Sequence, residues 1–291
     1  MLFLLGAVGC TSLVNIVLAL ASRRGWDGRA VLGWNYLASA AAAGLLAALA
    51  RPALYFPAPG LLAGALSGEM TGPSSMSFAV WFGLFTGVLY LLCLRAVEKS
   101  VREKGAGVTT LYQRLGILVP ILCSALLWGE VPSPVQLAGL AASVAVMAAL
   151  WGGGGRAAAR GPLAVFLLGG AVEFAGKVFQ KCALAEYRPV FLFVLFIACS
   201  AMALPRLVRA PKVPLAGIAL GAAMGLCGTL SSLMMMAALE TVPTGVAYPV
   251  LSVGSVAAVT AVDVLAFHRA LSRREKLALG LAALCLVLVN L

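Results

Sequence analysis

The chain has 291 residues, of which 62% are hydrophobic and 11% are charged, and its mean hydropathy is +1.03. Soluble domains carry roughly 25% charged residues, so this composition excludes a water-soluble globule, a disordered chain and a collagen-like repeat. The net charge of +11 comes from basic residues in short segments between apolar runs, which argues against nucleic-acid binding. The sequence therefore predicts a protein that crosses a lipid bilayer several times.

Apolar runs of membrane-spanning length follow one another along the whole chain. Their hydrophobicity is continuous rather than alternating, which favours helices over barrel strands. The seven cysteines lie within these runs without CxxC or metal-binding spacing, so we expect them to be packing residues. The expected fold is an all-α integral membrane protein with ten transmembrane helices, at residues 1–21, 30–50, 76–97, 107–128, 134–151, 162–185, 189–205, 214–239, 244–267 and 275–290.

A glycine run divides the sequence near its middle. Gly152–Gly155, followed by basic residues, is typical of a linker. The expected domains are a first five-helix repeat at 1–151, a Gly-rich linker at 152–161 and a second five-helix repeat at 162–291.

The two halves resemble each other weakly. The string GAVGCTSLVNIVLAL from Gly6 aligns with GAVEFAGKVFQKCAL from Gly170, and Gly116 aligns with Gly254. Because five is an odd number, the second repeat would enter the membrane in the opposite orientation. The sequence thus predicts an inverted repeat, a recurrent plan of secondary transporters that hold their substrate near the bilayer midplane.

The basic residues predict the orientation of the chain in the membrane. Sixteen Lys and Arg fall in the odd-numbered connections between the expected helices, and two, Arg51 and Arg188, fall in the even-numbered ones. The positive-inside rule then places the odd-numbered connections in the cytoplasm and both termini outside. The expected location is the cell (plasma or inner) membrane.

Two strings resemble the helix, turn and helix of the EamA-type transporters of the drug/metabolite transporter superfamily. They are LGILVPILCSALLWGEVPSPVQLAGL, from Leu115, and GVAYPVLSVGSVAAVTAVDVLAFHRALSRREKLALGLAALCLVLVNL, from Gly245. The second string also resembles the related small multidrug resistance transporters. The resemblance extends over nearly the whole chain and implies a membrane transporter with both termini in the cytoplasm, which is opposite to the charge count.

The resemblance also implies roles for individual residues. In the small multidrug resistance transporters an Ala-Tyr-Ala-x-Trp-Ser-Gly string lines the drug pocket, and Tyr248 and Ser252 match it, while Leu251 replaces its Trp. The proton-binding glutamate of those transporters corresponds in position to Glu173. The resemblance therefore implies a proton-coupling role for Glu173 and a substrate-binding role for Tyr248 and Ser252.

Five charged residues fall inside expected spans, where a charge usually faces a cavity or a partner: Arg114, Glu173, Lys177, Lys181 and Asp263. Successive turns of one helix carry Glu173, Lys177 and Lys181, and Lys181 is close enough to the helix end to reach the interface. We expect Glu173 and Lys177 to be the proton-coupling pair, although an ion pair that serves only the structure is the alternative. For Arg114, the alternative to substrate binding is pairing with a helix C-terminus or a neighbouring acid, and Asp263 is expected to be interfacial.

Substrate binding is expected to involve polar residues on several helices. Arg114 presents a guanidinium that suits a carboxylate or phosphate. The expected substrate-binding residues are Arg114, Gln113, Tyr248, Ser252, Gln180 and Asn15. For the small polar residues among them, packing between helices is the alternative role.

The expected function is secondary active transport, with export the expected direction, of a small polar metabolite by alternating access. A net positive cavity favours an anionic or zwitterionic substrate. A proton-coupled exporter of cationic or lipophilic drugs is the alternative, and an integral membrane transferase is a remote one. The sequence carries no recognisable catalytic motif, so no enzyme activity, cofactor or metal is expected. The expected partners are the small-molecule substrate, protons or another coupling ion, and the lipid bilayer. Nucleic acid is not among them, and the oligomeric state stays open, with a monomer possible.

Overall fold

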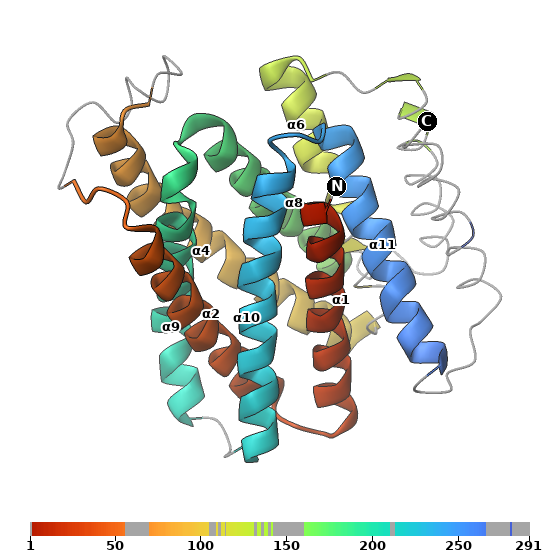
Figure 1. The fold of residues 1–291 in the computed structure, drawn as a ribbon. Helices are drawn as coiled ribbons and strands as arrows, with labels where there is room; N and C mark the ends of the chain where they lie inside the picture. The colour runs from red at the N-terminus through yellow and green to blue at the C-terminus, as the bar shows by residue number, and fades with distance from the viewer. Residues whose placement is uncertain are drawn as a thin grey trace. The chain divides into compact units, whose positions relative to one another are not determined.

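The computed structural model describes residues 2–55, 70–104, 112–130 without Arg114, 160–209 and 213–265, together with the single positions 109, 133, 134, 137, 138, 141 and 280. Within these ranges the chain is helical and contains no strand (Figure 1). The helices are α1 (Leu2–Arg23), α2 (Gly28–Ala50), α4 (Gly72–Lys104), α6 (Leu118–Trp128), α8 (Arg160–Cys182), the short η2 (Ala185–Tyr187), α9 (Arg188–Arg209), α10 (Leu215–Ala238) and α11 (Thr244–Leu265).

Many of these helices are long and apolar enough for a bilayer. Five segments reach membrane-spanning length and hydropathy, at Gly28–Ala50, Gly72–Val97, Leu163–Cys182, Ala185–Arg209 and Leu215–Ala238. Two shorter apolar helical segments cover Leu2–Val14 and Leu118–Trp128. The prediction of an all-α fold with membrane-type helices is confirmed for this part of the chain. Most of the expected helices at 134–151 and 275–290 and most of the linker lie outside the described residues.

Two expected helix boundaries are wrong. The helix expected at 76–97 continues to Lys104, because the charged residues after Val97 include good helix formers and no breaker occurs before Gly105. The helix expected at 107–128 is interrupted by a turn at Gly116 and Ile117, and α6 begins only at Leu118.

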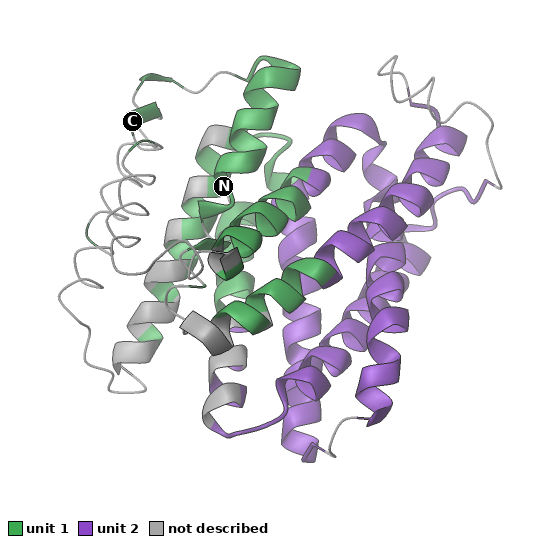
Figure 2. Cartoon of the chain, turned by 180° about the vertical axis from the view of Figure 1, so that it is seen from behind, with its two compact units in different colours: residues 1–12, 92–174, 237–291 green, residues 13–91, 175–236 purple. Residues whose placement is uncertain are grey.

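Contacts between residues divide the chain into two compact units (Figure 2). Unit 1 comprises 1–12, 92–174 and 237–291, and unit 2 comprises 13–91 and 175–236. Each unit therefore combines residues from both sides of the glycine run.

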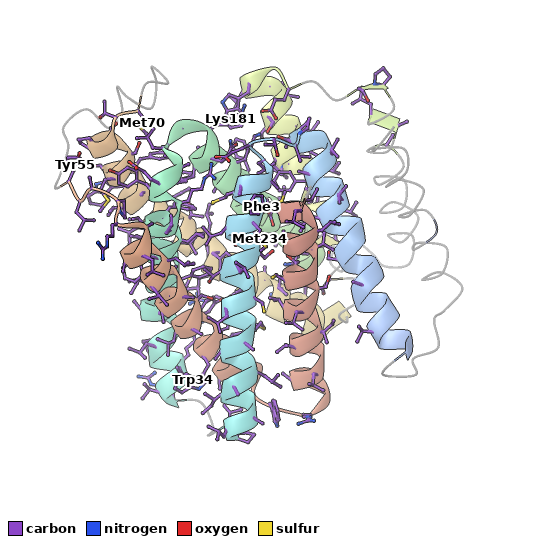
Figure 3. The ribbon with its side chains drawn as sticks, in the orientation of Figure 1. Phe3, Trp34, Tyr55, Met70, Lys181 and Met234 are labelled. Carbon is purple, nitrogen blue, oxygen red and sulfur yellow. The ribbon has the colours of Figure 1, made fainter. Side chains whose placement is uncertain are left out.

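Unit 2 is organised around α2 and α9, which pack along each other. A Cβ added at Gly33 of α2 would lie 2.9 Å from a methyl carbon of Leu207, and one added at Gly44 would lie 2.9 Å from the ring of Phe193. The first half of α2 thus contacts the last part of α9, and the second half of α2 contacts the first part of α9, so the two helices are antiparallel. Trp34 and the pair Tyr55 and Met70 mark opposite ends of this unit (Figure 3).

Two glycine pairs, each spaced by four residues, bring further helices of unit 2 into backbone contact. Gly83 and Gly87 of α4 pack on α9, and Gly221 and Gly225 of α10 pack on α2. Gly221 follows Gly83 by the same number of residues by which Gly225 follows Gly87. Glycine permits such close approach because it has no Cβ.

The partner atoms in these two contacts also correspond. A Cβ at Gly83 would meet the Phe191 carbonyl oxygen and the Val194 Cβ, whereas a Cβ at Gly221 would meet the same atoms of Val31 and Trp34. The offset along the chain from Val31 to Phe191 equals the offset from Trp34 to Val194.

The second glycine of each pair also has corresponding partners. Gly87 faces the Leu195 carbonyl oxygen and the Ala198 Cβ, and Gly225 faces the Asn35 carbonyl oxygen and the Ala38 Cβ. These partners on α2 and α9 are separated along the chain by the same offset as the partners of Gly221 and Gly83. The helix pairs α4–α9 and α10–α2 therefore pack in the same way.

Unit 1 contains another close contact between backbones, at the point where the expected fourth helix is interrupted. A Cβ at Gly170 of α8 would lie 2.5 Å from the Gly116 carbonyl oxygen and 2.5 Å from a methyl carbon of Val119. The backbone N–H of Gly116 hydrogen-bonds to the carbonyl oxygens of Tyr112 and Gln113. The glycine at 116 thus allows the close approach of α8, since a Cβ there would lie 2.9 Å from the Gly170 nitrogen.

Gly170→Ala should destabilise the protein, because the added methyl group has no room between Gly116 and Val119. We expect a loss of about 1–3 kcal/mol, the usual cost of overpacking, visible as a lower midpoint of thermal unfolding in detergent. Gly9→Ala on α1 is the control, since no atom lies within 4 Å of its added Cβ. Equal midpoints for the two variants would contradict this contact.

Candidate functional site

One face of α11 in unit 1 carries a row of buried polar side chains. Thr244, Tyr248, Ser252 and Ser255 are spaced by four, four and three residues, so they lie on the same side of the helix. All four are at least nine-tenths buried. We call this row the α11 polar face.

The α11 polar face is hydrogen-bonded to two other helical segments of the same unit. The Thr244 hydroxyl donates to Oε2 of Glu130 over 2.5 Å, and the Tyr248 hydroxyl donates to the backbone carbonyl of Glu173 over 3.0 Å. Within α11, the Ser255 hydroxyl donates to the Ser252 carbonyl over 2.9 Å. The first two bonds fasten the start of α11 to the end of α6 and to α8.

Local sequence explains how Glu130 comes to this position. Gly129 ends α6 with a φ of 66°, a left-handed conformation that glycine adopts readily, and its N–H bonds to the Ser124 carbonyl oxygen. Glu130 follows directly and lies half-buried beyond the helix end. Thr244 begins α11 immediately after Pro243, so the carboxylate meets a helix N-terminus, where negative charge is favourable.

The site combines acidic groups with buried hydroxyl groups that have spare bonding capacity. The Tyr248 side chain lies within electrostatic range of both the Glu130 and the Glu173 carboxylates. The hydroxyl oxygens of Ser252 and Ser124 are buried and have no hydrogen-bond partner among the described residues. Buried polar groups are usually paired, so these two oxygens are suited to bind a polar solute or water.

Gln113 lies near the same part of α8. A Cβ added at Gly169 would lie 3.9 Å from Cγ of Gln113 and 3.9 Å from Sγ of Cys93. Cys93 also lies within electrostatic range of Glu173. Unit 1 thus collects three of the expected site residues, Gln113, Glu173 and Tyr248, around α8, with Ser252 one turn further along α11.

The two lysines of α8 and Gln180 belong to unit 2. Lys177 is 2% exposed, and Oε1 of Gln180 is buried with no partner among the described residues. Lys181 is exposed near the end of α8, as expected for a side chain that reaches the interface (Figure 3).

A stack of aromatic rings surrounds Phe179 of α8, two positions after Lys177. Phe179 stacks on Phe191 of α9 with ring centroids 4.3 Å apart and on Phe78 of α4 at 5.8 Å. Phe82 continues the stack, at 4.7 Å from Phe78. The segment of α8 around Phe179 is therefore packed into an apolar part of unit 2.

The expected site residues are thus only partly brought together. Asn15 lies on α1, Asp263 lies on α11, and Arg114 lies outside the described residues. Sequence reasoning did not include Glu130 and Thr244 in the site, although the Gly129–Glu130 turn was a visible feature.

Thr244→Val removes the hydroxyl group that bonds Glu130 while keeping the side-chain volume. We expect the free energy of unfolding to fall by about 1.5–3 kcal/mol, the range for a hydrogen bond to a charged group. Thr241→Val, at an exposed position of the preceding turn where the hydroxyl makes only a long 3.4 Å bond to the Ala238 carbonyl, should lower the midpoint of thermal unfolding much less. A similar loss in both variants would show that the bond to Glu130 contributes nothing.

Comparisons with known proteins show a shared fold but no family. No family model matches the chain, and no curated protein does. A solved chain described as "Crystal structure of protein" matches over 99% of this chain and 98% of its own length, with a TM-score of 0.60 and 20% identity. At that identity the likeness shows that the two chains share a fold along their whole length.

Proposed function

We propose that this protein is a secondary active transporter, an exporter, that moves a small polar solute across the cell membrane by alternating access. In this proposal ten transmembrane helices form two inverted five-helix repeats like those of the EamA-type drug/metabolite transporters. The observation that carries the proposal is the pair of corresponding contacts in unit 2, α4 on α9 and α10 on α2.

These contacts have the relation that an inverted repeat requires. Gly83 and Gly87 pack on the first half of α9, and Gly221 and Gly225 pack on the first half of α2. Because α2 and α9 are antiparallel, their first halves extend toward opposite ends of unit 2. The same arrangement thus occurs twice, in opposite directions, which is the plan of many alternating-access transporters.

The charges on α8 favour an anionic or zwitterionic metabolite as the substrate. Lys177 is nearly completely buried, and Glu173 is half-buried one turn earlier on the same helix. A buried ammonium can bind a substrate carboxylate or phosphate, and a carboxylate can exchange a proton or bind a substrate amine. The transport of one solute can then be coupled to proton movement through the two groups.

A second candidate is proton-coupled export of cationic or lipophilic drugs. It is favoured by the two carboxylates, Glu130 and Glu173, within electrostatic range of the buried Tyr248. A screen for thermal stabilisation by anions, zwitterions and quaternary cations separates the candidates, because a bound ligand raises the unfolding midpoint.

Glu173→Gln should retain substrate binding but lose accumulation driven by a proton gradient, because the amide cannot gain and lose a proton. The measurement is uptake into proteoliposomes with an imposed pH gradient, compared with equilibrium binding. Glu186→Gln, at an exposed position after α8, is the matched control and should behave as the unaltered protein does. If Glu173→Gln still concentrates the solute, Glu173 has a structural role only.

The proposed orientation places the odd-numbered connections in the cytoplasm. In a cysteine-free background, Arg102→Cys and Arg273→Cys should resist a membrane-impermeant maleimide in intact cells and react after permeabilisation. Glu186→Cys, in an even-numbered connection, should react in intact cells. Labelling at positions 102 and 273 without labelling at 186 would reverse the orientation and agree with the usual one of the resembled family.

A further inference from the structure

One side of α4 carries a long row of exposed side chains that changes from apolar to basic along the helix. Its members follow one another at alternating intervals of four and three residues: Trp81, Phe85, Val88, Leu92, Arg95 and Lys99. This spacing keeps all of them on the same side of the helix. The first four are apolar and the last two are basic. We call this row the α4 exposed face.

The other side of α4 is packed against neighbouring helices. Gly83 and Gly87 lie against α9 in unit 2, and Cys93 and Val97 form a buried cluster with Val165 of α8 in unit 1. A row of exposed large apolar side chains is unfavourable in water, whereas in a bilayer it contacts acyl chains that are equally apolar. The α4 exposed face therefore has the character of a lipid-facing surface.

The length of the α4 exposed face matches the thickness of a bilayer. Lys99 follows Trp81 by 18 residues, which corresponds to about 27 Å along the helix. The hydrocarbon core of a membrane is about 30 Å thick. Trp is favoured at a membrane interface, and Arg and Lys extend their side chains from the edge of the core to the headgroups. Arg95 and Lys99 thus lie at the headgroup level of one leaflet, with Leu92 and Val88 at the depth of its acyl chains.

A basic pair at the end of α9 has a different relation to its apolar neighbours. Helix α9 exposes Ile197, Leu204 and Val208 on one side, and Arg206 and Arg209 are exposed near its end. Arg206 follows Leu204 by two residues and so lies on roughly the opposite side of the helix. Arg209 follows Val208 directly and is turned away from it by about 100°. The basic pair therefore continues the apolar row on α4 but not on α9.

We propose that the basic end of the α4 exposed face is a binding site for an anionic phospholipid. The phosphate group contacts Arg95 and Lys99, and the acyl chains lie along Leu92 and Val88. The two basic residues are one helical turn apart, so both cationic groups can bond to a single phosphate. A pair of cations favours a headgroup with a net negative charge over a zwitterionic headgroup, whose ammonium group it repels.

This inference goes beyond the proposed function. It requires that α4 crosses a bilayer, but it does not require that the protein transports a solute, and it holds for either orientation of the chain.

Native mass spectrometry of the delipidated protein in a neutral detergent tests the preference for an anionic headgroup. The probes are phosphatidylglycerol, which is anionic, and phosphatidylcholine, which is zwitterionic. The tightest site should bind phosphatidylglycerol several-fold more tightly than phosphatidylcholine. Equal affinities for the two lipids would overturn the proposal.

Paired substitutions test whether α4 provides the site. The double variant Arg95→Gln, Lys99→Gln should lose the preference, because glutamine retains a polar side chain without the charge. The control variant Arg206→Gln, Arg209→Gln removes the same charge from the end of α9 and should retain the preference. An equal loss in both variants would mean that total charge attracts the lipid, and would overturn the proposal.

Two single variants guard against a loss of folding. Arg95→Lys keeps the charge and should retain the preference, and Lys99→Gln should weaken the binding of phosphatidylglycerol in the same direction as the double variant does. Midpoints of thermal unfolding in detergent without lipid select the variants that fold.

A competition experiment distinguishes a lipid from a free phosphate group. Excess inorganic phosphate at constant ionic strength should not displace phosphatidylglycerol, because phosphate has no acyl chains to lie along Leu92 and Val88. Displacement would mean that the basic pair binds any phosphate, and would overturn the lipid site.

Photocrosslinking locates the lipid on the protein. Benzoylphenylalanine replaces Leu92 or, as the control, Leu204 on the exposed side of α9, in bilayers that mix the two lipids. The ratio of phosphatidylglycerol to phosphatidylcholine adducts should be higher at position 92 than at position 204. The double variant Arg95→Gln, Lys99→Gln should remove this difference. Equal ratios in the otherwise unaltered protein would overturn the proposal.

The outcome is separable from that of the proposed function. A lipid preference in a protein that moves no solute in proteoliposomes would retain the lipid site and overturn the transporter. Solute uptake by a protein without the lipid preference would retain the transporter and overturn the lipid site.

Discussion

Close approach of helix backbones at glycine is the constraint on which unit 2 depends. Within a bilayer the hydrophobic effect does not drive helices together, because lipid is as apolar as the side chains it would replace. Packing and buried hydrogen bonds must hold the helices instead, and both require short distances. Gly83, Gly87, Gly221 and Gly225 provide those distances, and Ser39 and Cys199 place a donor against the carbonyl groups that the glycines expose.

Unit 1 meets the same requirement with polar side chains. The α11 polar face satisfies its hydroxyl groups on Glu130 and on the backbone of Glu173, at the cost of burying them. Burial of an unpaired hydroxyl is unfavourable, and the oxygens of Ser252 on this face and of Ser124 on α6 have no partner among the described residues. Apolar groups of the same shape at these two positions would cost no hydrogen bond within this part of the chain.

The sequence predicts the helices well and their neighbours poorly. Continuous apolar runs mark α2 and α9 within a few residues, but hydropathy does not distinguish a charged loop from the charged last turns of α4. The bond from Tyr248 ends on the backbone of Glu173, which no side-chain pattern reveals. The correspondence between the α4–α9 and α10–α2 contacts is difficult to find in the sequence for another reason. The offset between α2 and α9 is larger than the offset between α4 and α10, because the connection from α2 to α4 is longer than that from α9 to α10. An alignment with a single offset therefore does not find both correspondences.

Each of the corresponding contacts joins a helix made early in synthesis to one made late. Ser39 and Gly225 are 186 residues apart, and Cys199 and Gly87 are 112 apart. At about 5–20 residues per second, α2 waits on the order of 10 to 40 s for α10. During that interval its uncovered surface can pair with the α10 of a neighbouring copy, since the two pairings are chemically identical. Exchange of segments between chains therefore competes with correct folding as the density of newly inserted protein rises.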